Sequence, residues 1–181
     1  MRVRLESRVE RGDDPADGGF YAWSLADTES KDLEDEIYPF VFDVPDYGLH
    51  HALELPAMVN VQLAAFAHEA EAYPDEDAYR SAQQQKYDGP GFAAESFIPS
   101  GLFQPGGEET SHPEAFAILS GTVLRAETLV NPAGGASFHW AKVRTLGGEV
   151  DLVADPEVLV GELSEGGVIS GTFWLSGRIE G

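Results

Sequence analysis

The histidines are the first residues to consider, because the chain has no cysteine and imidazole is the commonest metal ligand among protein side chains. His50 and His51 are adjacent, and His68 lies three residues before Glu71. On a helix this last spacing places two side chains on one face. Imidazole and carboxylate groups together suit zinc, iron or manganese. These four residues are therefore the candidate metal ligands, and with them a metal-dependent hydrolytic enzyme becomes one hypothesis.

The same histidines also have an interpretation without a metal. Neighbouring residues on a strand point to opposite faces, so His50 and His51 would not bind one ion together from a strand. The chain contains no His-Glu-x-x-His motif. Solvated or hydrogen-bonded histidines in an acidic neighbourhood are the favoured interpretation, and the metal enzyme is the alternative.

A second candidate site lies on an expected strand at residues 136–146, where Trp140, Lys142 and Arg144 fall on one side because side chains alternate with period two. A tryptophan beside two cations could hold an anionic small ligand or an acidic partner segment. Single-stranded nucleic acid is a lower-ranked ligand for such a face. The favoured alternative is structural, with the aromatic ring in the core and the cations paired with acids across the sheet.

Other catalytic patterns are absent from the sequence. No Gly-rich stretch ends in the Gly-Lys-Ser/Thr of a phosphate-binding loop, and Gly-x-Ser-x-Gly does not occur. Acidic residues are so numerous that no particular pair of carboxylates can be singled out as a catalytic or calcium-binding pair. The sequence therefore indicates no particular cofactor and no family, and an enzyme is not the preferred reading.

Charge is the strongest feature of the composition. The chain of 181 residues carries 32 acidic and 11 basic residues, a net charge of −21. Residues 12–79 hold 17 of the acids and a single base, Lys31. Such a field repels polyanions, which disfavours nucleic acid as a partner. No apolar run is long enough to span a membrane and the N-terminus does not look like a secretory signal, so we expect a cytoplasmic protein without membrane contact.

Hydrophobic periodicity predicts both strands and helices. Expected strands cover residues 2–10, 20–25, 116–130, 136–146, 149–154 and 168–179, with an extended segment at 38–45. A helix is expected over 56–73, because Val59, Leu63 and Phe66 recur at spacings of four and three. A second helix is expected over 75–87, with acids in its first turn and Lys86 near its end.

These elements predict an α+β protein with three stretches. Residues 1–100 hold an N-terminal strand pair and one or two helices, residues 101–113 form a Gly/Pro-rich connection, and residues 114–181 form an antiparallel β-rich half. The suggested form of this half is a small OB-like barrel, completed by an N-terminal strand or by a strand that the pattern does not reveal. The preferred function is a non-catalytic binding module for a small ligand or a protein partner.

Overall fold

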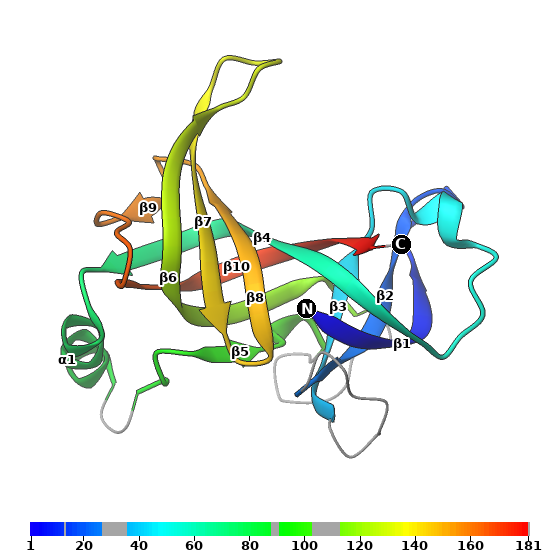
Figure 1. The fold of residues 1–181 in the computed structure, drawn as a ribbon, viewed down its shortest axis with the longest axis horizontal. Helices are drawn as coiled ribbons and strands as arrows, with labels where there is room; N and C mark the ends of the chain where they lie inside the picture. Colours follow the sequence, from blue (N-terminus) through cyan, green and yellow to red (C-terminus); the bar gives the residue numbers. More distant parts are fainter. Residues whose placement is uncertain (13, 27–35, 88–90, 103–112, 181) are drawn as a thin grey trace. The chain divides into compact units, whose positions relative to one another are not determined.

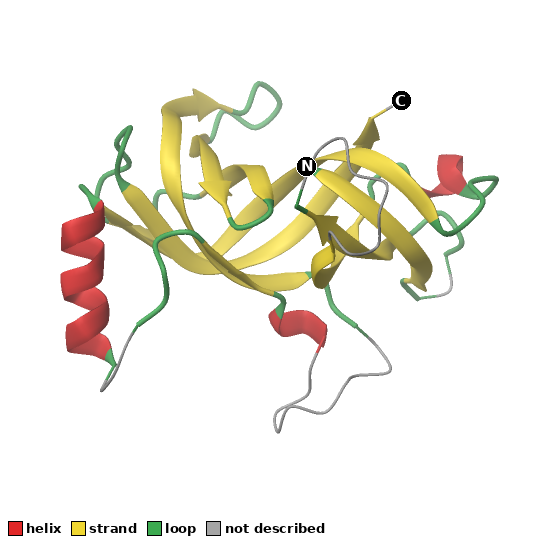
Figure 2. Ribbon diagram, turned by 60° about the horizontal axis from the view of Figure 1, so that its bottom comes forward, coloured by secondary structure: helices red, strands yellow, loops and turns green. Residues whose placement is uncertain are grey.

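The computed structural model describes residues 1–12, 14–26, 36–87, 91–102 and 113–180. The described chain is mostly β-sheet with one α-helix, in keeping with the expected β-rich α+β class (Figures 1 and 2). Among the described helices, none combines the length and the apolar character that crossing a membrane requires. The expected connection at 101–113 lies for the most part outside the described residues.

The strands are β1 (Arg2–Glu10), β2 (Gly18–Leu25), β3 (Glu36–Asp43), β4 (Ala57–Tyr73), β5 (Ser96–Ile98), β6 (Phe116–Val130), β7 (Ser137–Thr145), β8 (Gly148–Ala154), β9 (Leu159–Val160) and β10 (Val168–Glu180). The α-helix is α1 (Glu76–Lys86), and short 3-10 helices cover Tyr47–His50 and Ser100–Leu102.

The chain forms two compact units, each assembled from separate stretches of sequence. Unit 1 comprises residues 1–64, 99–117 and 174–181, and unit 2 comprises residues 65–98 and 118–173. The long strands β4, β6 and β10 each contribute residues to both units.

Unit 1 is built on an antiparallel meander of β1, β2 and β3. β1 also pairs antiparallel with β4, and β3 pairs in parallel with β10 where Asp43 lies opposite Ser176. Because β10 and β4 are neighbours as well, the strand order β1-β2-β3-β10-β4 returns to β1 and makes a ring-like sheet. Its core is aromatic, and the rings of Phe40 and Phe42 stack with their centroids 5.6 Å apart.

Unit 2 contains a second meander, β6-β7-β8, with the short strand β5 on the outer side of β6. In the strand order β8 is followed by β4, and β10 pairs with β6, so this order is also ring-like. A Cβ at Gly121 would lie only 2.3 Å from Val143 Cγ1 and 2.5 Å from the Arg144 carbonyl oxygen. Glycine is therefore required where β6 and β7 come close.

The structure corrects the expected helix at 56–73, which is strand β4. Val61, Leu63 and Ala65 are buried at every second position, as on a strand with one covered face. Phe66, which suggested a helical period, is among the exposed hydrophobic residues. The reasoning that placed His68 and Glu71 on one helical face is therefore wrong. The residues beyond 113 do not complete a ring of strands by themselves. β4 lies between β10 and β8 in the strand order, and with it β6, β7, β8, β4 and β10 form a ring-like order of five strands.

The second expected helix is confirmed as α1. Asp75 is its N-cap, and its carboxylate oxygen Oδ1 accepts a hydrogen bond of 2.7 Å from the Ala78 amide. Glu76 and Asp77 lie in the first turn and Lys86 in the last, which suits the helix dipole.

Candidate functional site

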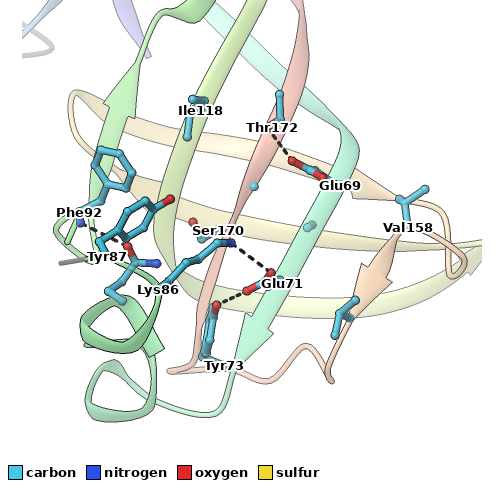
Figure 3. Close-up of a pocket in the computed structure, with 14 residues that line it drawn as sticks. Glu69, Glu71, Tyr73, Lys86, Tyr87, Phe92, Ile118, Val158, Ser170 and Thr172 are labelled. Carbon is cyan, nitrogen blue, oxygen red and sulfur yellow. Dashed lines mark hydrogen bonds and ion pairs between the residues drawn. The ribbon is translucent and has the colours of Figure 1, made fainter. Parts of the chain in front are cut away.

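A pocket of about 340 Å³ lies within unit 2, where the end of β4, the beginning of β10, the segment before and in β9, and the last turns of α1 come together (Figure 3). Its walls combine acids, a base, hydroxyls, aromatic rings and aliphatic side chains. The polar and aromatic lining residues are Glu69, Glu71, Tyr73, Gln83, Lys86, Tyr87, Phe92, Ser170 and Thr172, and the aliphatic ones include Ile118, Val158 and Val160.

The acidic wall of the pocket is formed by side chains on one face of β4. Glu69, Glu71 and Tyr73 occupy alternate positions of β4, and Ala70 between them is buried. Beside them, a Cβ at Gly171 of β10 would lie 2.1 Å from the Glu69 carbonyl oxygen. Glycine at this position therefore lets the two strands approach closely.

Helix α1 supplies the opposite wall. Gln83 and Lys86 are three residues apart, which places them on adjacent positions of one helix face, and Tyr87 follows as the C-cap. The Gln83 side-chain oxygen accepts a hydrogen bond of 3.4 Å from the amide of Phe92. That contact fixes the returning chain against the helix.

Glu71 is the centre of the polar network. Its carboxylate accepts a short hydrogen bond from the Tyr73 phenol, and its Oε1 lies 3.4 Å from Lys86 Nζ (Figure 3). The Tyr73 hydrogen bond and the nearby ammonium hold the pKa of Glu71 below its usual value. Burial, and then the hydrogen bond to Glu71, raise the pKa of Tyr73 well above its usual value. At neutral pH the pocket therefore holds an ionised Glu71 and a protonated Tyr73.

Glu69 is tied more loosely. Its Oε1 accepts a hydrogen bond of 3.4 Å from the Thr172 hydroxyl on β10 (Figure 3), and the residue is exposed. The carboxylate has capacity for further donors, since it can accept about four hydrogen bonds.

Two aromatic rings stand at the pocket wall formed by α1 and the chain that follows it. Tyr87 and Phe92 meet edge to face, with ring centroids 5.7 Å apart and an interplanar angle of 76°. They are 42% and 41% exposed. A fixed aromatic pair left this open offers apolar contact to a ligand at little cost in side-chain entropy.

The residues predicted as a ligand site lie elsewhere in unit 2, on β7. Ala141 and Val143 are buried while Trp140, Lys142 and Arg144 are not, so these three lie on one side as expected. Lys142 Nζ is 2.7 Å from Asp151 Oδ1, directly across the β7–β8 register, and Arg144 Nε is 2.9 Å from Glu95 Oε1. The expected pairing of these cations with acids is confirmed, whereas Trp140, which was expected in the core, is only half-buried and is not part of it.

The histidines predicted as metal ligands are divided between the units. His50 ends the 3-10 helix of unit 1, where its Nε2 lies 3.4 Å from Asp46 Oδ1. The ring of His51 contacts Tyr47 edge to face. His68 and Glu71 belong to unit 2, on β4. Within the described ranges, no three His, Asp or Glu side chains converge as a metal site.

Comparisons of the chain with protein-family models, with curated proteins and with solved structures return no match.

Sequence reasoning named Glu71 but missed its neighbours in the pocket. The alternation Glu69-x-Glu71-x-Tyr73 was a usable signal, because it places three polar side chains on one face once the segment is a strand. Lys86, Tyr87 and Phe92 carry no comparable signal, since only tertiary packing brings them to that face.

Proposed function

We propose that the protein is a non-catalytic binding module and that the pocket of unit 2 receives a small ligand. The observation that carries this proposal is the convergence of acidic, basic, hydroxyl and aromatic side chains on one open space of about 340 Å³. Ligand sites of small molecules have this character, with apolar walls and a few polar groups that fix orientation.

The state of the polar groups favours binding over catalysis. Lys86 Nζ lies 3.4 Å from Glu71 Oε1, so the amine already has a carboxylate partner in the pocket. Tyr73 donates to Glu71, and the raised pKa of its phenol disfavours the phenolate form. Glu71 has a lowered pKa and is a correspondingly weak base. Glu71 and Tyr73 are therefore suited to hydrogen bonding and poorly suited to proton transfer near neutral pH.

The strand order of unit 2 supports the same view. A three-strand meander whose order closes through β4 and β10 is consistent with an OB-like architecture, which is common among binding modules. Fold alone does not decide function. The outer face of β7 is a weaker candidate for nucleic acid, because Lys142 and Arg144 already have carboxylate partners and the chain carries a net charge of −21.

Fragment binding tests the proposal. The ¹⁵N-labelled chain would be titrated with a library of cationic, anionic and neutral fragments while amide shifts are recorded. We expect hits that move amides of β4, α1 and β10, and we expect Thr172→Trp, which adds bulk inside the pocket, to abolish them. Val130→Trp is the control, because Val130 is an exposed residue of unit 2 that does not line the pocket. Fragment hits that survive Thr172→Trp, or no hits at all, would contradict the proposal.

A further inference from the structure

We propose that the ligand of this pocket is a neutral polyhydroxylated ring, that is, a saccharide unit. This inference rests on the proposed function and adds the chemical class of the ligand. It follows from the donors and acceptors of the pocket, from its aromatic pair and from its charge.

The polar lining offers acceptors and donors side by side. Glu69 and Glu71 provide carboxylate oxygens, Lys86 provides N–H donors, and the Ser170 and Thr172 hydroxyls can do either. A ligand that satisfies both kinds of group must itself donate and accept at neighbouring positions. Hydroxyl groups do so, and two adjacent hydroxyls can donate to the two oxygens of one carboxylate.

The aromatic pair gives such a ring an apolar surface to pack on. Tyr87 and Phe92 are held edge to face, and the chain around them is anchored at Gln83. The C–H face of a saccharide ring can cover the open part of these side chains while its hydroxyls turn toward the acids. Val158, Val160 and Ile118 provide further apolar contact.

Charge argues against the other ligand classes. An anion would meet Glu69 and Glu71 in a chain of net charge −21, with Lys86 as the one cation among the lining residues. A purely apolar ligand would remove these carboxylates from water without replacing their hydrogen bonds. An organic cation would compete with Lys86 for Glu71 and would leave the hydroxyls of Ser170 and Thr172 unused.

The size of the pocket fits a small ligand. Its volume of about 340 Å³ is near the lower end of the usual range for small-molecule sites, about 300–1,000 Å³. One or two sugar rings are therefore a more suitable occupant than a long chain buried over its whole length.

The test is an NMR titration of the ¹⁵N-labelled full chain with glucose, galactose, N-acetylglucosamine, maltose and cellobiose, and with cyclohexylamine and benzoate as charged probes. We expect at least one saccharide to shift amides of β4, α1 and β10 in a saturable way. Glu69→Gln should weaken that binding about tenfold, the equivalent of about 1.4 kcal/mol, because a charged acceptor is lost. Glu165→Gln, an exposed acid outside the pocket, should leave it unchanged.

Folding of each variant is checked by the dispersion of its amide spectrum, and Phe92→Ala gives an independent second disruption of the site. A response to cyclohexylamine or benzoate but to no saccharide would overturn the ligand class while leaving a small-ligand pocket in place. Saccharide shifts that are equal in Glu69→Gln, Phe92→Ala and the parent chain would also overturn it. No pocket response to any probe or fragment would overturn both proposals.

Discussion

The two units share a ring-like strand order but use their polar side chains differently. In unit 1, Arg8 Nη2 donates to the carbonyl oxygens of His50, His51 and Leu53 at 2.9, 3.1 and 2.9 Å. Its guanidinium also lies over the rings of Phe20 and Tyr47, 5.4 and 5.8 Å from their centroids. The Arg8 side chain therefore satisfies three backbone carbonyl oxygens and has a structural role in unit 1.

In unit 2 the charged groups of the pocket bind mainly to one another. Lys86 reaches Glu71 from α1, and both side chains are about half exposed. Both partners in that contact are side chains, so a ligand could rearrange it at small cost. The comparison teaches that a charged side chain is a candidate for ligand binding when its partners are other exposed side chains, and a structural element when its partners are several backbone carbonyls.

The largest expected difference between the units concerns their aromatic residues. Phe40 of unit 1 is fully buried, and Phe40→Ala should lower the free energy of unfolding by about 3–5 kcal/mol because it leaves a cavity. Phe92→Ala in unit 2 should cost under about 1 kcal/mol, since much of that ring already faces solvent. Urea unfolding followed by tryptophan fluorescence measures both changes. Equal losses would remove the distinction between a packed interior and a pocket wall.

The second prediction addresses Arg8. Arg8→Lys keeps the charge but cannot reproduce a planar group that contacts three carbonyls and two rings, so we expect a loss of about 2 kcal/mol. The matched control is Arg178→Lys, at an exposed position of β10, which should change stability by less than about 0.5 kcal/mol. If the two variants unfold at the same urea concentration, the contacts of Arg8 with the three carbonyls and two rings do not stabilise unit 1.

The third prediction separates a structural ion pair in unit 2 from the groups of the pocket. The side chains of Lys142 and Asp151 are 32% and 10% exposed, so their coupling in a double-mutant cycle of Lys142→Met and Asp151→Asn should be about 1–2 kcal/mol. The pair Arg80–Glu76 on the surface of α1 should give only about 0.3–0.5 kcal/mol. A coupling near zero for Lys142 and Asp151 would return the outer face of β7 to the list of candidate binding surfaces.

Local pattern was enough to predict most strands and α1, but it failed at β4. Val59, Val61, Leu63 and Ala65 alternate as a strand requires, whereas the spacing of Val59, Leu63 and Phe66 also fits a helix. Tertiary context decides between the two periods. As a strand, β4 forms backbone hydrogen bonds with its neighbours in the sheet, and a helix in the same place would leave those neighbours unpaired.

The candidate site was less predictable than the fold. The pairing of Lys142 with an acid followed from strand alternation and was confirmed, because it is a contact between adjacent strands. The pocket brings together Glu71, Lys86 and Thr172, which are far apart in the sequence. Such contacts depend on how the helix packs against the strands, and this packing cannot be predicted from residue type alone.

The smallest expected effect is the pH dependence of the Glu71 network. Because the Tyr73 hydrogen bond and Lys86 lower the pKa of Glu71 in the folded state, folding is favoured by its ionised form. That contribution is present above the unfolded-state pKa of about 4.3 and is lost as the pH falls through the lower folded-state value. Since the side chain is about half exposed, we expect it to be under about 1 kcal/mol.

The measurement is the difference in the free energy of unfolding between the parent chain and Glu71→Gln, followed by urea titrations from pH 7 downward. The difference should be largest at neutral pH and should shrink below about pH 4.3. Glu165→Gln removes the same charge outside the pocket and controls for the general effect of net charge. A difference that stays constant across this range would mean that Glu71 stabilises unit 2 by packing alone. Its carboxylate could then bind a ligand without a loss of stability.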